Sequence, residues 1–176
     1  MTRNSTTPPA ARTIILASTS PYRRELMQRL GLDFSWAPPE VNEGLLAGEK
    51  PVALVQRLAG SKAGSLAGRF PGALIIGSDQ VAVLPDGEIL TKPGGHAAAR
   101  AQLQSCSGRT VRFLTGVCLL DAVSGRGQTD VVECEVSFRP LQVRMVLLKR
   151  RFHPLLPGRV RIRQLQHPGQ RRVPPP

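Results

Sequence analysis

The chain has 176 residues, of which 41% are hydrophobic and 20% charged, as is usual for a globular protein. This length supports one domain with a real core, or one domain elaborated into two lobes, and argues against two small independent domains. The longest apolar runs, such as residues 73–76, are far too short to cross a bilayer, so no membrane partner is expected.

The net charge of +12 is unevenly distributed along the chain. Nine of the 24 Lys and Arg residues lie from Leu141 onward, where there is no Asp or Glu, so the first 140 residues carry a net charge of only +3. The basic character therefore belongs to the C-terminal segment, and nucleic acid is not an expected partner, since the tail has one aromatic residue, Phe152, and no recognisable reading module.

The first predicted helix follows a short apolar strand at residues 14–16 and a turn rich in hydroxyl groups. Pro21 preceded by serine is typical of a helix that begins at Pro21 with the serine as N-cap. The N-terminal amides and the positive end of the helix dipole would then lie near Ser18, Arg23 and Arg24, an arrangement that suits an anion. An ordinary capped helix explains the same spacing, so from these residues alone both interpretations stay open.

Hydrophobic periodicity and turn residues predict the remaining elements. They are a strand at 33–37, a loop at 38–50, a helix at 51–66, a strand at 72–84 whose apolar run is interrupted by residues 77–80, a short strand at 89–90, a helix at 96–104, and strands at 110–121 and 129–138. This order predicts a sheet with helices packed on it, in an α/β or α+β fold.

Asp79 is the least expected residue in the chain, because it interrupts a near-continuous apolar run. An unpaired buried carboxylate costs several kcal/mol, so Asp79 needs partners. It could pair with a buried lysine, or it could serve as a metal ligand or general base at the lip of a cleft. We favour the functional interpretation. Lys62 lies near the end of its helix, and the more common interpretation of a lysine in that position is an ordinary solvated side chain.

The three cysteines, Cys106, Cys118 and Cys134, lie far apart in the sequence and show no metal-ligand spacing. They predict reduced, buried thiols and a cytoplasmic protein. The three histidines form no cluster either, and we assign them no chemistry.

Six motifs occur in one order along residues 13–141. They are LASTSPYRRELM (16–27), EVNEG (40–44), LAGSKA (58–63), IIGSDQVAVL (75–84), GEILTKPG (87–94) and SGRTVRFLTGVCLL (107–120). Together they resemble the Maf family of nucleoside triphosphate pyrophosphatases, and Tyr22 and Gln80 resemble the subgroup acting on 7-methyl-GTP. The resemblance implies an α/β fold, with a mixed twisted sheet, flanking helices and a two-lobed cleft like that of inosine triphosphatases. It also implies hydrolysis of the α–β phosphoanhydride to a monophosphate and diphosphate, a divalent metal cation (Mg²⁺ or Mn²⁺), and a homodimer.

The resemblance also implies roles for individual residues. Asp79 would be the base that activates water, and Glu43 and Asp79 would contact the metal. The phosphate-binding residues would be Ser18, Arg23, Arg24, Lys62 and Lys92. Tyr22 and Gln80 would govern base selectivity, and Tyr22 could stack on the cationic ring of a methylated guanine.

Two features depart from the family pattern. Asn42 stands where the family usually has Asp, and the family's acidic helix and GLP motif do not appear after residue 141. The tail could be a poorly ordered basic arm, a weakly patterned final strand and helix, or the product of a shifted reading frame, which we favour.

We therefore expect a leader at 1–12, a Maf-like domain at 13–140 whose second lobe is incomplete, and a basic, poorly ordered tail at 141–176. The alternative function is a catalytically impaired nucleotide-binding or interaction protein.

Overall fold

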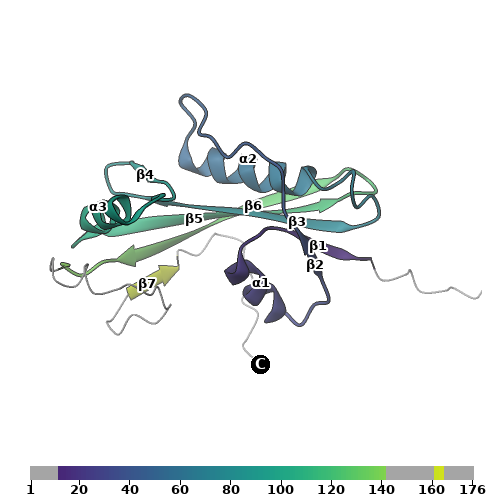
Figure 1. Cartoon of the computed structure of the whole chain (residues 1–176), viewed down its shortest axis with the longest axis horizontal. Helices are drawn as coiled ribbons and strands as arrows, with labels where there is room; N and C mark the ends of the chain where they lie inside the picture. Colours follow the sequence, from purple (N-terminus) through teal and green to yellow (C-terminus); the bar gives the residue numbers. More distant parts are fainter. Residues whose placement is uncertain (1–11, 142–160, 165–176) are drawn as a thin grey trace, which may run out of the picture. The chain divides into compact units, whose positions relative to one another are not determined.

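The computed structural model describes residues 12–141 and 161–164 (Figure 1). Except for Arg12, Leu141 and residues 161–164, the expected leader and tail lie outside the described residues. The elements are β1 (Ile14–Ala17), α1 (Pro21–Gln28), β2 (Ser35–Ala37), α2 (Pro51–Gly64), β3 (Leu74–Val83), β4 (Ile89–Leu90), α3 (His96–Cys106), β5 (Thr110–Asp121), β6 (Gly127–Ser137) and β7 (Arg161–Gln164). Every helix and strand predicted from the sequence is confirmed, with boundaries that differ by a few residues at most.

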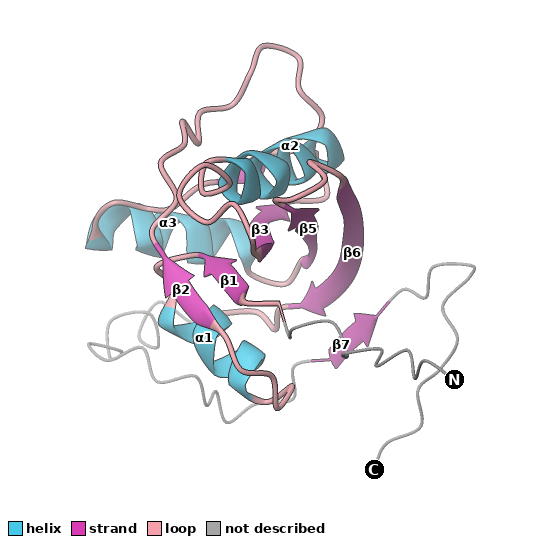
Figure 2. Ribbon diagram, turned by 90° about the vertical axis from the view of Figure 1, so that its right-hand side faces the viewer, coloured by secondary structure: helices cyan, strands magenta, loops and turns pink. Residues whose placement is uncertain are grey.

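The strands form one seven-stranded sheet in the order β2-β1-β3-β5-β6-β7, with β4 also paired to β3 (Figure 2). Strand β1 is parallel to β2 and to β3, whereas β4 is antiparallel to β3 and β7 is antiparallel to β6. The predicted mixed sheet with flanking helices is therefore confirmed. β7 shows that a final strand, one of the alternatives for the tail, forms at residues 161–164.

The chain divides into two compact units. Unit 1 comprises Met1–Glu43, Leu58–Ser78 and Val117–Thr129, and unit 2 comprises Gly44–Arg57, Asp79–Gly116 and Asp130–Pro176. In unit 1 the core joins β1 and β3 to the second half of α2. In unit 2 one cluster joins β3 and β5 to the first half of α2, and another joins the same strands to α3. Each unit therefore has a core of its own.

The strand predicted over residues 72–84 is confirmed, because β3 runs from Leu74 to Val83 and continues through the polar residues that interrupt the apolar run at 77–80. Gly77 is required by packing, since a Cβ atom there would lie 2.1 Å from the carbonyl oxygen of Ala59 and 2.7 Å from the amide nitrogen of Ala63. The backbone of α2 thus rests directly on β3. The polar residues that follow, Ser78 and Asp79, are buried within the strand.

The cysteines are free thiols, of which Cys106 and Cys118 are buried and Cys134 is half-buried. The expectation of buried thiols therefore holds for two of the three. Within residues 12–141 and 161–164, no helix is long and apolar enough to cross a membrane.

Candidate active site

The N-terminus of α1 has the predicted capping geometry. The Ser20 side chain accepts a hydrogen bond from the backbone nitrogen of Arg23 at 3.4 Å, and Pro21 occupies the first helical position. Ser18 is only 3% exposed, and its Oγ accepts from the Ser20 nitrogen at 3.1 Å and from Nη1 of Arg23 at 3.5 Å. The first turn of the helix carries no acidic residue. A hydroxyl and a guanidinium therefore lie together at the positive end of the helix dipole, as an anion site requires.

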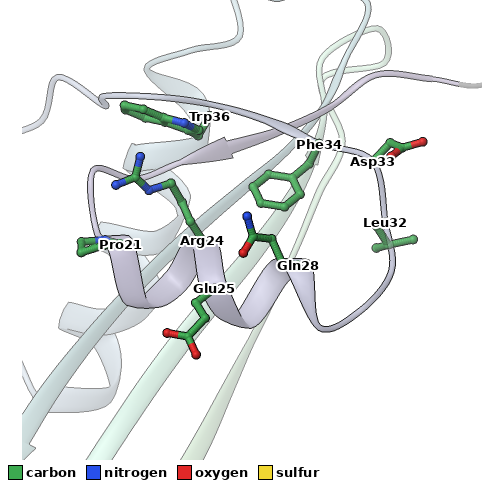
Figure 3. Close-up of a pocket in the computed structure, with 8 residues that line it drawn as sticks. All are labelled: Pro21, Arg24, Glu25, Gln28, Leu32, Asp33, Phe34 and Trp36. Carbon is green, nitrogen blue, oxygen red and sulfur yellow. The ribbon is translucent and has the colours of Figure 1, made fainter. Parts of the chain in front are cut away.

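Arg24 takes a different direction from Arg23. Its guanidinium lies over the ring of Trp36, 4.2 Å from the ring centroid, as a cation–π contact. The side chains of Arg24 and Trp36 line a cavity of about 490 Å³ between α1 and the segment that leads into β2. The carboxylate of Glu25, on the same lining, points away from Trp36 (Figure 3). The Arg24 guanidinium is thus held by an aromatic ring, whereas that of Arg23 lies at Ser18. Tyr22 is 59% exposed.

Lys62, on the last turn of α2, is almost completely buried. Its ammonium lies 2.7 Å from Oε1 of Glu43, and the Lys62 side chain is 4% exposed whereas that of Glu43 is 43% exposed. The close packing of α2 on β3 at Gly77 fixes this turn of the helix. The predicted alternative of a solvated lysine is wrong, since Lys62 is held as a buried cation.

In unit 2, the neighbouring residues Asp79 and Gln80 face opposite sides of the sheet. Side chains alternate along a strand, so Asp79 shares its face with Val81, which packs against Val55 of α2. Gln80 shares its face with Ala82, which packs in the cluster that contains Cys106 of α3. Asp79 is 9% exposed and Gln80 is exposed. The Asp79 carboxylate and the Gln80 amide thus lie on opposite faces of the sheet, among different neighbours.

Gln80 is oriented by β5, because its Nε2 donates to Oγ1 of Thr115 at 2.8 Å. Lys92 is exposed on the segment between β4 and α3. That segment is fastened to α3, because Nε2 of Gln102 donates to the carbonyl oxygen of Thr91 at 2.7 Å.

The loop that leads into α2 is anchored by Arg57. Its Nε and Nη2 bind the two carboxylate oxygens of Glu49 at 2.6 and 2.7 Å, and Nη2 also donates to the carbonyl oxygen of Gly44 at 2.9 Å. This bidentate pair holds the pKa of Glu49 below its usual range, chiefly through the hydrogen bonds from Arg57. The ionised pair fixes the end of the loop that follows Glu43.

The described residues contain no group of three or more His, Cys, Asp or Glu side chains that could hold a metal ion. Asp79 and Glu43 nevertheless offer the oxygen donors that Mg²⁺ and Mn²⁺ prefer. Mg²⁺ is commonly held by one or two carboxylates together with substrate phosphates. Each carboxylate taken by itself therefore suits a metal that arrives with substrate phosphates better than one held by protein ligands alone.

Of the predicted site residues, the structure brings Ser18 together with Arg23 and Glu43 together with Lys62. The sequence did not indicate Trp36, Thr115 or Gln102: Trp36 contacts Arg24, Thr115 holds Gln80, and Gln102 holds Thr91, the neighbour of Lys92. Each of these contacts joins residues 11 to 35 positions apart, so no local pattern signals it. Only Thr115 could have been noticed in the sequence, because it is a polar residue within a predicted strand.

Comparisons with known proteins show relatives in sequence and in fold. The family model for Maf-like proteins matches residues 13–147. The 7-methyl-GTP pyrophosphatase of Pseudomonas putida is 52% identical over 128 residues, which are 73% of this chain and 66% of that protein. The protein of the same name from Xanthomonas campestris pv. campestris (strain 8004) is 56% identical over 130 residues, with the same coverage of both chains. The chain thus spans just under two thirds of the length of these relatives.

A solved structure supports the fold alone. The HAM1 protein from Coxiella burnetii matches with a TM-score of 0.51 and 16% identity, over 72% of this chain and 73% of that one. Taken with the family match over most of its length, these findings show that the chain belongs to the Maf family of proteins.

Proposed function

We propose that this chain hydrolyses the α–β phosphoanhydride of 7-methyl-GTP, or of a related nucleoside triphosphate, to a nucleoside monophosphate and diphosphate. The observation that carries this proposal is 49–56% identity, over 128–133 residues, to proteins named 7-methyl-GTP pyrophosphatase. The contact of Arg23 with Ser18 at the amino end of α1 and the buried ammonium of Lys62 support it chemically.

On this proposal, the phosphates are bound by positively charged side chains held by the fold. Ser18 and Arg23 meet at the amino end of α1, and Lys62 presents a buried ammonium. A cation in a partly desolvated place attracts phosphate oxygens more strongly than one in water. Lys92 adds a cation from the segment before α3. Arg24 is assigned the same role, and its guanidinium leaves the ring of Trp36 when a phosphate binds.

Asp79 is assigned as the base that orients and activates the attacking water. Its burial within β3 restricts its rotamers, which holds a carboxylate in one direction. Asp79 and Glu43 would hold the divalent cation together with phosphate oxygens. That cation, when bound, neutralises the charge that develops on the leaving diphosphate.

Base selectivity is assigned to Tyr22 and Gln80. Tyr22 is 59% exposed and offers a ring face to the cationic 7-methylguanine. We further propose that the protein acts in the cytoplasm, in keeping with its free thiols, and as a homodimer. Light scattering coupled to size-exclusion chromatography measures the oligomeric state directly, and a monomer at the concentration used in the activity assay would contradict the homodimer.

The decisive experiment measures diphosphate released by the purified chain from 7-methyl-GTP with Mg²⁺ or Mn²⁺. Asp79→Asn keeps the shape but removes the base, so the rate falls at least about 100-fold. Asp130→Asn is the matched control, because Asp130 is an exposed carboxylate on β6, and this variant retains the parent rate. Circular dichroism confirms that both variants are folded.

Two results would contradict the proposal. Calorimetric binding of the triphosphate with no diphosphate formed by the folded parent chain would make it a nucleotide-binding protein. Full activity in Asp79→Asn would remove the role of that residue.

A further inference from the structure

Trp36 is directed towards α1 by its position on β2. In the pairing with β1, Leu16 lies beside Trp36 and Ala17 lies beside Ala37. Ala37 is buried in the core that includes the second half of α2. Because side chains alternate along a strand, Trp36 points to the opposite face of the sheet. There its ring meets the guanidinium of Arg24, which projects from α1 (Figure 3).

Within the described residues, the Arg24 guanidinium is held by an aromatic ring and not by a carboxylate. The two carboxylates on the lining of the same cavity, those of Glu25 and Asp33, point away from Arg24 (Figure 3). Oε1 of Glu25 instead accepts from Nη2 of Arg29 at 2.6 Å. Over residues 12–141 and 161–164, Arg24 makes no ion pair. A ring leaves the charge of the guanidinium in place, so Arg24 keeps its attraction for an anion.

The contact between Arg24 and Trp36 is weak enough to be exchanged for a phosphate. It lies at the surface, because Trp36 is 48% exposed. A cation–π contact at an exposed site favours the stacked state about two- to fivefold. The hydrogen bonds from a guanidinium to a phosphate are charge-assisted and stronger. On the proposed function Arg24 leaves the ring when a phosphate binds, so the ring and the phosphate compete for one guanidinium.

Resting on that proposed function, we propose that Trp36 is a positioning residue that holds Arg24 away from the phosphates and thereby weakens nucleotide binding. Arg24 is ready to bind only in the molecules in which it has left the ring, about a sixth to a third of them, and the apparent affinity is reduced by that fraction. Trp36 acts only through Arg24, so it raises KM and leaves kcat unchanged.

The test measures calorimetric binding of inorganic diphosphate to the parent chain and to Trp36→Leu, together with turnover of 7-methyl-GTP. Removal of the ring frees Arg24, so diphosphate binds about three- to sixfold more tightly. KM for 7-methyl-GTP falls by a similar factor and kcat does not change. Damage to the fold would not produce a gain in affinity. Trp36→Phe keeps a weaker ring, so its affinity lies between those of the parent and Trp36→Leu.

Two controls isolate the contact with Arg24. Phe34→Leu removes the other aromatic ring from the same cavity lining, and because Arg24 stacks on Trp36 instead, diphosphate binds as it does to the parent. Arg24→Met removes the guanidinium, so Trp36→Leu has no further effect on diphosphate binding in that background.

The fluorescence of Trp36 reports the contact directly, because Trp36 is the single tryptophan of the chain. Saturating diphosphate changes its emission in the parent as Arg24 leaves the ring. In Arg24→Met the emission stays constant, at a diphosphate concentration that calorimetry shows to saturate that variant. Unchanged emission in the saturated parent would show that Arg24 stays on the ring, and it would overturn the inference.

Three binding results would also overturn it. They are equal or weaker binding of diphosphate by Trp36→Leu, tighter binding that persists when Arg24 is already Met, and no binding by the parent chain. Because binding does not require catalysis, the proposed function fails separately. A parent chain that binds diphosphate but releases none from 7-methyl-GTP would refute that function, and tighter binding by Trp36→Leu would still support the role of Trp36.

Discussion

At the scale of single residues, the pair formed by Lys62 and Glu43 is asymmetric. The ammonium is almost fully buried, while its partner carboxylate is 43% exposed. Water already solvates the carboxylate and continues to do so when the lysine is removed, whereas the lysine side chain is only 4% exposed. The cost of breaking a pair lies mainly in the charge that stays behind in the interior.

We therefore expect Glu43→Gln to destabilise the fold more than Lys62→Met does. Glu43→Gln leaves a buried ammonium facing a neutral amide, which costs about 1–3 kcal/mol. Lys62→Met replaces that ammonium with an apolar side chain of similar length and costs less than about 1 kcal/mol. Urea unfolding of the two variants and the parent measures the difference, and the reverse order would show that Glu43 is the more dependent partner.

At the scale of elements, α2 is the most tightly placed helix. Its backbone rests on β3 at Gly77 and on β5 at Gly116, where an added Cβ would lie 2.4 Å from the carbonyl oxygen of Val55. Neither glycine has a positive φ, so close approach rather than backbone conformation requires it. Because Lys62 and Arg57 both project from α2, the contacts of each depend on this approach.

Gly77→Ala forces its methyl group into the backbone of α2, which the helix can relieve only by moving away from the strand. We expect a loss of about 3 kcal/mol in the free energy of unfolding. Gly60→Ala is the matched control on α2, since a Cβ there meets open space, and the better helix former raises stability by up to about 1 kcal/mol. Equal stability of Gly77→Ala and the parent would show that α2 can shift without cost.

The ion pair of Arg57 with Glu49 makes the anchoring of the loop before α2 dependent on pH. The pKa of Glu49 is lowered in the fold, so the pair stabilises the protein above the unfolded value of about 4.3, and this contribution is lost as the pH falls further. Glu49→Gln should therefore lower the melting temperature at pH 7, and the difference from the parent should narrow at about pH 3. A difference that is constant with pH would exclude the ionised carboxylate as its cause.

Local signals explain which elements could be predicted from the sequence. The serine before Pro21 marks where α1 begins, and the pattern of apolar residues marks β5 from Thr110 to Asp121 without error. The strand at 72–84 could be predicted, but the close approach of α2 to Gly77 could not be, because no local pattern signals a contact with a helix that lies earlier in the chain. The stacking of Arg24 on Trp36 could not be predicted for the same reason, because a contact between separated residues leaves no periodic pattern in the sequence.

At the scale of the whole molecule, the charge is concentrated at one end of the sequence. Residues 1–140 carry a net charge of +3, against +12 for the whole chain. Attraction to polyanions depends on the number of cations that meet the surface and weakens with salt. The order of elements and the mixed sheet could be predicted at this scale, whereas the pairing of β7 with β6 could not, because residues 161–164 lie in a segment without regular patterning.

We expect the full chain to bind heparin at low salt through residues 141–176, with a strong dependence on salt concentration. A variant that ends after Pro140 should elute from heparin at much lower salt, because nine cations are lost. A variant that ends after Gln164 keeps β7 and, of the nine cations, loses only Arg171 and Arg172, so it should elute close to the parent. Equal elution of all three would locate the polyanion surface in the first 140 residues.

The alternation of Asp79 and Gln80 along β3 has a consequence for how such a protein can be redesigned. On the proposed roles, one residue decides how the anhydride is cleaved and the next decides which nucleotide is accepted. Because the pleat of the strand turns them to opposite faces, Gln80 can be exchanged without repacking the surroundings of Asp79. On these proposed roles, substrate range and chemical rate would be separable, and a library confined to Gln80 would explore the first while leaving the second in place.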